Sequence, residues 1–352
     1  MVDSGEIEYS RRASRQRLIV FSLLFVVLTA AGLYAVYEQF AGRSMTFDTR
    51  LVAPETLIAL FGLLLVYFVS DGLRLHFTLR ALGHHLAYRA IFRLVFINLF
   101  FSNITPMATG GGFAQIWYLH NHGVPVGRAT AATTIRTVLA ILFIFSLTPF
   151  FLLTLKPLEG NMIAGGVETA LAFFIVLYLG FFIVLLLRAH WLIGPLSALL
   201  RGARRVHIIS ETRHRRWQFK ARREMLRFSQ SFSDYIRGRL LFIGLSILFT
   251  AVFLLSLFSF PALLMYSLDY NVDYLVSLGL LVVTTFIMYF SPTPGAAGIS
   301  EGVFGSFFQS VLSGNHLLLV IVSWRFLTIY LGMIIGLIVL QKELVMNHRR
   351  VR

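Results

Sequence analysis

Residues 291–302 read S-P-T-P-G-A-A-G-I-S-E-G, a helix-breaking run that carries one carboxylate, Glu301, between two strongly apolar segments. A related run, N-I-T-P-M-A-T-G-G-G at residues 103–112, shares the Thr-Pro start and the glycines and also interrupts apolar sequence. Proline and glycine disfavour a continuous helix, so each run predicts a turn between two shorter helices. We interpret the two runs as the turns of two re-entrant hairpins that meet inside a lipid bilayer.

The composition predicts a polytopic membrane protein. Hydrophobic residues make up 57% of the 352 residues and charged residues only 13%, too few for the surface of a soluble domain. The net charge of +15 does not predict a nucleic-acid partner, because the basic residues cluster beside apolar spans, as cytoplasmic flanks do. The absence of cysteine excludes disulfides, iron–sulfur clusters and thiol chemistry.

Long apolar runs predict an all-α fold with about six full transmembrane helices, since about 20 residues cross a hydrocarbon core of about 30 Å. The predicted spans are residues 18–37, 54–76, 129–155, 163–187, 240–265 and 317–340. The first follows a basic tail, as a signal peptide would, but it exceeds a usual signal core, so we interpret it as an uncleaved helix. The predicted membrane domain, residues 18–340, thus lies between basic tails at 1–17 and 341–352.

The positive-inside rule predicts how the two remaining apolar regions, 90–120 and 275–315, are arranged. Two spans, 129–155 and 163–187, lie between the basic linker that contains Arg74, Arg80, Arg89 and Arg93 and the basic segment 188–239. Because this number is even, region 90–120 is expected to start and end on the cytoplasmic side. Region 275–315 follows an outer loop with Asp269 and Asp273 and precedes an inward-going span, so both of its ends are expected outside. The rule therefore predicts hairpins of opposite orientation in a cell inner membrane, with cytoplasmic N- and C-termini.

Oppositely oriented hairpins are typical of the inverted repeats found in many transporters. The spacing supports such a repeat, because Pro106 precedes Arg136 by 30 residues and Pro294 precedes Arg325 by 31. The alternative is a bundle of eight crossings with kinked helices. Segment 188–239, a basic insert with interspersed apolar and aromatic residues, predicts a cytoplasmic interfacial helix that contacts anionic lipid head groups; a solvated linker is the alternative.

The two turns and two arginines predict an anion site. Broken backbone at membrane depth is tolerated only beside protein or a water-filled cavity, and the helix N-termini near residues 110–112 and 299–300 would attract an anion there. Arg136 and Arg325 lie in apolar sequence, and a guanidinium suits phosphate or carboxylate. The predicted substrate-binding residues are Arg136, Arg325, Glu301, Asn103, Thr109, Gly110, Gly111, Gly112, Gln115, Pro294, Gly298 and Ser300.

Several of these residues have alternative roles. Glu301 either pairs with Arg136 or Arg325 as a structural counter-ion, or it exchanges a proton or competes with the substrate anion. Asn103 and Gln115 bind a head group or satisfy the hairpin backbone. Asp71, three residues before Arg74, predicts an interfacial intrahelical pair.

No enzyme motif occurs. Lys156, Lys220 and Lys342 each lack the preceding glycine of a Walker A loop, and neither G-x-S-x-G nor H-E-x-x-H is present. His84 and His85 lack further ligands at metal spacing, so no catalytic residue, cofactor or metal is predicted.

The two runs resemble those of a known family. N-I-T-P-M-A-T-G-G-G-F-A-Q-I-W-Y-L at residues 103–119 and S-P-T-P-G-A-A-G-I-S-E-G-V-F at 291–304 are similar to the lysylphosphatidylglycerol synthase transmembrane region, or flippase-like domain, family. Members carry G-G-E after the first proline, where this chain has Gly112 in place of the glutamate; Glu301 matches the acidic position of the second motif.

The resemblance implies a stand-alone translocase of phospholipids or polyprenyl-type lipids, without the transferase domain that follows in aminoacyl-lipid synthases. In this hypothesis a phosphate-bearing head group enters between the hairpins while its acyl chains stay in the bilayer. The alternatives are a membrane enzyme that modifies lipid head groups and a secondary transporter of a soluble anion. No protein partner is predicted.

Overall fold

The computed structural model describes residues 47–105, 108–155, 230–309 and 311–350, with scattered positions at 23–30, 173–180 and 223–228. Within these ranges every regular element is a helix, which confirms the predicted all-α membrane fold. The predicted spans 18–37 and 163–187 and most of the insert 188–239 lie outside the continuously described residues.

Four helices in the described part of the chain are long and apolar enough to cross a membrane. They are α2 (Pro54–Ala81), α5 (Val126–Thr154), α9 (Leu240–Ser267) and the continuous run Gly314–Glu343. That run consists of α12 (Gly314–Arg325), the π-helical η7 (Phe326–Tyr330) and the start of α13 (Leu331–Arg350). These helices confirm the predicted spans at 54–76, 129–155, 240–265 and 317–340 and extend most of them by a turn or so.

Shorter helices flank the two helix-breaking runs. The first run separates α3 (Tyr88–Ile104) from α4 (Thr109–Asn121), and the second separates α10 (Tyr274–Met288) from α11 (Ile299–Phe308). Two short 3₁₀ turns, η2 (Thr49–Val52) and η6 (Pro294–Ala296), complete the described elements. At 17, 13, 15 and 10 residues, each of the four helices is shorter than the roughly 20 residues that a full crossing needs.

The two breaks share one local backbone arrangement. In the first, the amide of Ala108 donates to the carbonyl of Thr105 at 3.3 Å, and in the second the amide of Ala296 donates to Thr293 at 3.1 Å. Both alanines have positive φ, 54° and 53°, which is uncommon for a residue with a Cβ atom. The sequence T-P-x-A therefore closes the same kind of turn in both halves of the chain.

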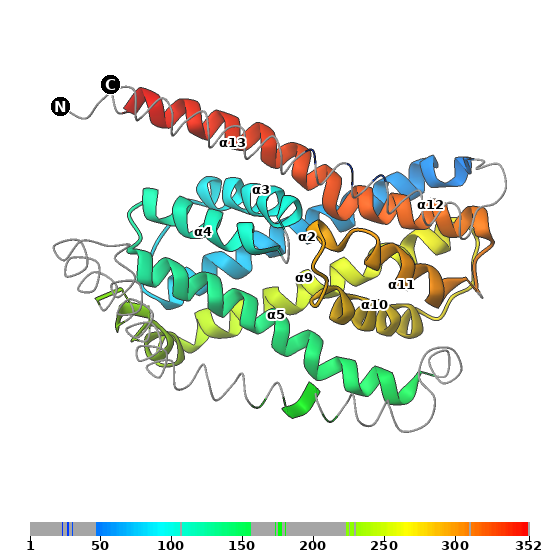
Figure 1. Ribbon diagram of the computed structural model, residues 1–352, viewed down its shortest axis with the longest axis horizontal. Coiled ribbons are helices and arrows are strands. Elements are labelled where there is room, and N and C mark those ends of the chain that lie inside the picture. Colours follow the sequence, from blue (N-terminus) through cyan, green and yellow to red (C-terminus); the bar gives the residue numbers. More distant parts are fainter. Residues whose placement is uncertain are drawn as a thin grey trace, which may run out of the picture. The chain divides into compact units, whose positions relative to one another are not determined.

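Close contacts divide the chain into two compact units. The described part of one unit comprises residues 47–64, 95–114 and 257–350, and that of the other comprises residues 65–94, 115–155 and most of 223–256. In the first unit α11 packs between α10 and α12, and α13 runs along α3 (Figure 1). A Cβ atom on Gly336 would collide with the carbonyl of Phe96, so this glycine lets α13 approach α3 closely.

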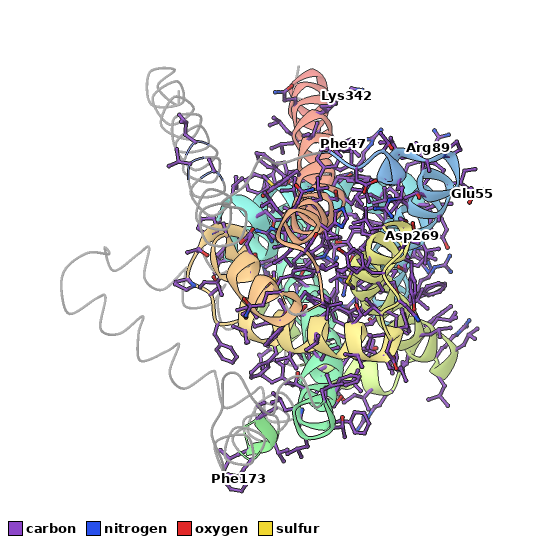
Figure 2. All side chains as sticks on the ribbon, turned by 90° about the vertical axis from the view of Figure 1, so that its right-hand side faces the viewer. Phe47, Glu55, Arg89, Phe173, Asp269 and Lys342 are labelled. Carbon is purple, nitrogen blue, oxygen red and sulfur yellow. The ribbon has the colours of Figure 1, made fainter. Side chains whose placement is uncertain are left out.

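In the first unit, residues between α9 and α10 meet His316, in the first turn of α12, and two residues at η2. Tyr270 Oη lies 2.8 Å from His316 Nδ1, and His316 Nε2 lies 3.3 Å from Asp48. Arg50 bridges Asp48 and Asp269, at 2.6 and 2.7 Å, and Figure 2 marks Asp269 just beyond the end of α9. We call these five residues the Asp48 cluster; it holds both ends of the second hairpin region together.

In the second unit, the residues that flank α3 and α4 also meet. Arg128 Nη1, at the start of α5, donates to His84 Nε2 at 3.0 Å, just before α3. The amide of Gly127 donates to Glu224 at 2.8 Å, and Gly238 lies against the carbonyl of Ala81. The loops before α3, after α4 and before α9 thus lie together.

Candidate functional site

The first buried charge centre joins three helices. Asp71 and Arg74 come from α2, Gln115 from α4 and Arg136 from α5, and we call these four residues the Asp71 centre. Asp71 Oδ1 accepts from Arg74 Nε at 2.6 Å and from Arg136 Nη2 at 2.5 Å. Arg136 Nη1 donates to Gln115 Oε1 at 2.8 Å. The two guanidinium groups therefore converge on one carboxylate oxygen.

All four side chains of the Asp71 centre are buried, and aromatic rings cover part of it. Arg74 Cζ lies 3.8 Å from the centroid of the Phe253 ring, in a cation–π contact. Tyr67 stacks on Phe253, with the two ring centroids 5.0 Å apart. Since charges in such an environment are poorly screened, each interaction is stronger here than in water.

Arg136 is incompletely compensated. Its charge faces a carboxylate that it shares with Arg74, and its second hydrogen bond goes to a neutral amide. Among the described residues Arg136 Nε has no hydrogen-bond partner, although the side chain is only 4% exposed. A buried guanidinium with a spare donor favours an additional anionic oxygen.

The second charge centre is built from one turn and two helices. Glu301 Oε1 lies 2.7 Å from Arg325 Nε, and Arg325 Nη2 donates to the carbonyl of Gly295 at 2.9 Å. Glu301 Oε2 accepts from the amide of Gly298 at 2.7 Å and lies 2.8 Å from Ser300 Oγ. We call Gly295, Gly298, Ser300, Glu301 and Arg325 the Glu301 centre. Arg325 and Glu301 are 0% and 1% exposed.

The sequence positions Glu301 through the start of α11. Gly298 is the N-cap residue with φ of +84°, which glycine adopts without strain. Glu301, three residues later, reaches back to the N-cap amide, the carboxylate half of a capping box, and its charge also complements the positive end of the helix dipole. The π-helical segment η7 begins directly after Arg325, at Phe326.

Arg325 also keeps an unused donor. Nε and Nη2 face Glu301 and Gly295, but Nη1 has no hydrogen-bond partner within the described ranges. Arg325 Nε and Glu301 Oε1 form an ion pair, but their relative orientation does not meet hydrogen-bond geometry. Nε therefore also lacks a hydrogen bond among the described residues. A fully buried guanidinium with a free Nη1 is costly unless a further acceptor binds there.

The remaining predicted residues lie in or beside the two turns or at the start of α4. Asn103 Nδ2 donates to the carbonyl of Leu99 at 2.7 Å, so it satisfies hairpin backbone. The amide of Gly110 donates to Thr105 Oγ1 at 2.8 Å. A Cβ on Gly111 would meet Ser102, whereas one on Gly112 would meet nothing within 4 Å. Thr109 begins α4 and is exposed, and Pro294 is buried in the second turn.

Six of the twelve predicted residues therefore belong to the two centres. Gln115 joins Arg136 in the second compact unit, while Gly298, Ser300, Glu301 and Arg325 assemble in the first. Arg325 pairs with Glu301, whereas Arg136 shares Asp71 with Arg74. Asp71 was interpreted as half of an intrahelical pair with Arg74; that pair exists, but it is buried, and it also binds Arg136.

Residues outside the spans show how the flanking loops are held. The hydrogen bond from Arg50 holds the pKa of Asp48 well below its usual range, so this carboxylate stays charged. Burial, with Arg128 and His85 nearby, lowers the pKa of His84, which keeps the ring neutral and able to accept from Arg128. No group of three or more potential metal ligands occurs among the described residues.

The comparisons with known proteins identify relatives along most of the chain. The family model described as the lysylphosphatidylglycerol synthase TM region matches residues 17–336. A UPF0104 membrane protein of Archaeoglobus fulgidus is 22% identical over 321 residues, which cover 91% of this chain and 96% of the relative. A UPF0104 membrane protein of Methanocaldococcus jannaschii is 31% identical over 136 residues, 37% of this chain and 38% of that relative.

Proposed function

The chain belongs to the lysylphosphatidylglycerol synthase transmembrane-region family, and we propose that it is a lipid translocase that binds a phosphate-bearing head group at the Asp71 centre. One observation carries this proposal: Arg136 is buried, shares its only carboxylate with Arg74, and keeps Nε free of hydrogen bonds among the described residues. A lipid phosphate would supply the missing acceptor and the missing negative charge. Arg136 is then the principal head-group residue, with Gln115 holding its guanidinium in place.

Helix α4 favours a lipid over a soluble anion. Its Gln115 faces Arg136, whereas Phe113 and Trp117, four residues apart on another face, are 74% and 39% exposed. Exposed aromatic rings suit contact with acyl chains or with the interface. One helix thus combines a polar contact for the head group with an apolar face for the tails.

The contacts at the helix ends support re-entrance of both hairpins. His84 and Arg128 flank α3 and α4 and touch each other, so that region starts and ends at one side. Tyr270 and His316 flank α10 and α11 and also contact each other, so this region too starts and ends at one side. On the positive-inside rule, we assign the two hairpins to opposite membrane faces. In this topology both termini are cytoplasmic and the membrane is the cell's inner membrane.

Reconstitution in liposomes tests the proposed activity. Vesicles would contain fluorescent phosphatidylglycerol or a fluorescent diacylglycerol without phosphate, and a membrane-impermeant quencher would report movement between leaflets. We expect the wild type to accelerate the movement of the phosphate lipid in particular. Arg136→Gln should reduce this rate by about tenfold or more, because one charge-assisted contact contributes about 1.5–3 kcal/mol.

Arg128→Gln is the matched control, since Arg128 also lies on α5 but contacts His84 at the helix end. Its rate should stay near that of the wild type. The proposal is contradicted if the wild type moves neither lipid, if it moves both equally, or if Arg136→Gln moves the phosphate lipid as fast as the wild type. Transport of inorganic phosphate without lipid movement would instead identify a soluble-anion transporter.

A further inference from the structure

The Glu301 centre has the donor arrangement of an anion site in which a protein carboxylate already sits. The carboxylate of Glu301 lies at the N-terminus of the ten-residue helix α11, where the amide of Gly298 and the hydroxyl of Ser300 contact Oε2. Arg325 approaches Oε1 from α12. A backbone amide, a hydroxyl and a guanidinium at a helix start are also the groups that bind phosphate.

The centre offers more donors than Glu301 uses. Arg325 Nη1 has no hydrogen-bond partner among the described residues, and the side chain is 0% exposed. A carboxylate has two oxygens, and both are already occupied by Arg325, Gly298 and Ser300. A phosphate group has at least one more oxygen to offer, and it could use Nη1 as well as the other donors.

There is also room to approach the helix start. Gly298 is exposed, and a Cβ atom on it would meet nothing within 4 Å. Gly302, one turn further along α11, has the same open surroundings. The glycines therefore place no Cβ atom over the backbone at the start of α11, which favours the close approach of an oxyanion to the amide of Gly298.

We propose that Glu301 is a tethered occupant of a second phosphate site, and that an incoming phosphate group displaces its carboxylate from Arg325 and the α11 N-terminus. This inference rests on the proposed function for the source of the phosphate, a lipid head group. No covalent step is involved: Arg325 exchanges one anionic partner for another. Glu301 thereby limits the affinity of the site, so that a bound head group can leave again.

Charge removal at Glu301 gives a clear prediction. Glu301→Gln keeps an acceptor for Gly298 and Ser300 but removes the negative charge, so the site should bind phosphate about tenfold more tightly or better. In Glu301→Gln combined with Arg325→Gln, binding should fall back to or below the level of the wild type. Because Trp324 precedes Arg325 and stacks on Phe304 at 5.2 Å, its fluorescence reports binding at this site.

The experiment titrates purified protein with inorganic phosphate and, separately, with short-chain phosphatidylglycerol; short-chain diacylglycerol is the neutral control. Replacement of Trp117, Trp191 and Trp217 by Phe leaves Trp324 as the only reporter. Tighter binding of either phosphate ligand by Glu301→Gln supports the inference, and the two titrations distinguish a free anion from a head group. Unchanged or weaker binding by Glu301→Gln overturns it, as does a gain in affinity that survives in the double variant.

Further measurements distinguish this result from a folding defect and from a failure of the proposed function. A melting curve for each variant confirms that it is folded, and Ser300→Ala, which retains the charge of Glu301, should not show the gain in affinity. Lipid movement by wild-type protein without tighter binding in Glu301→Gln overturns the second site alone. Tighter binding in Glu301→Gln without any lipid movement by the wild type overturns the proposed function alone.

Discussion

The Asp71 centre and the Glu301 centre both pair a buried arginine with a carboxylate, but they hold the carboxylate differently. Asp71 accepts from two guanidinium groups and connects α2 with α5. Glu301 forms an ion pair with one guanidinium and accepts a hydrogen bond from the first turn of its own helix. The first carboxylate therefore connects distant parts of the chain, whereas the second fills a local site from which it can be displaced.

The difference also bears on the missing acid of the first hairpin. Gly112 stands where the resemblance to the family predicts a glutamate, yet Arg136 has a buried carboxylate partner in Asp71 on α2. The second half keeps its acid, Glu301, within the hairpin. Each half thus retains an arginine–carboxylate pair, although the carboxylate comes from a different element.

Neutralising Asp71 should have the largest effect. Asp71→Asn leaves Arg74 and Arg136 without their shared charge, and the loss of one partner from a buried pair costs about 3–5 kcal/mol. Glu301→Gln leaves only one arginine uncompensated and keeps two acceptor contacts, so its loss should be clearly smaller. Denaturant unfolding in detergent micelles measures both. Equal losses would contradict the distinction between a connecting and a displaceable carboxylate.

Replacing Arg325 by lysine should be the next largest change. A lysine has a single charged nitrogen and lacks the planar fork with which Arg325 contacts both Glu301 and the carbonyl of Gly295, so we expect a loss of about 1.5–3 kcal/mol. Arg128→Lys is the control, because Arg128 makes one described contact, to His84 at the helix end. The same unfolding assay applies. A loss no greater than that of the control would show that the two-point contact of Arg325 is unimportant.

Two glycine replacements should have opposite signs. Gly298→Ala forces a Cβ atom into a backbone with φ of +84° and should destabilise the protein by about 1–2 kcal/mol. Gly112→Ala lies in the first turn of α4 with open space around it and should stabilise that helix by up to about 1 kcal/mol. Melting temperatures of the two variants, compared with the wild type, measure the contrast. If both replacements destabilise the protein, the predicted difference in sign is wrong.

The smallest effect should come from the Asp48 cluster. Arg50 lowers the pKa of Asp48, so this carboxylate contributes stability above the unfolded value of about 4 and loses it as pH falls through its lower folded value. Asp48→Asn should therefore be slightly less stable than the wild type at neutral pH, and the difference should shrink towards lower pH. Melting curves between pH 7 and the acid limit of the detergent sample test the sign. A difference that grows on acidification would be inconsistent with this pairing.

The sequence predicted the helices and their breaks because both depend on local properties. Apolar length marks a span, and T-P followed by glycines ends a helix, so α4 and α11 begin where we predicted. For Glu301 the sequence left open whether it is a structural counter-ion or a functional acid. The structure shows that its partner is Arg325. Its displacement by a phosphate group is a proposal.

The partner of Arg136 was not predicted from the sequence. Asp71 lies 65 residues before Arg136, and its obvious neighbour Arg74 suggested a local pair instead. Helical spacing shows which residues share a face, but it does not show which helix packs against that face. The available signal was the spacing of Ser70, Asp71, Arg74 and Thr78, which places four polar residues on one face of an apolar helix; all four are buried in the structure.

A structure of the protein in nanodiscs that contain phosphatidylglycerol would show directly whether a lipid head group binds at the Asp71 centre. We predict a lipid phosphate within hydrogen-bonding distance of Arg136 Nε, with acyl chains that leave towards the bilayer past α4. Asp71 would still accept from Arg74 and Arg136 in that complex. An Arg136 without a bound phosphate, or a small enclosed anion without acyl chains at this position, would contradict the proposal.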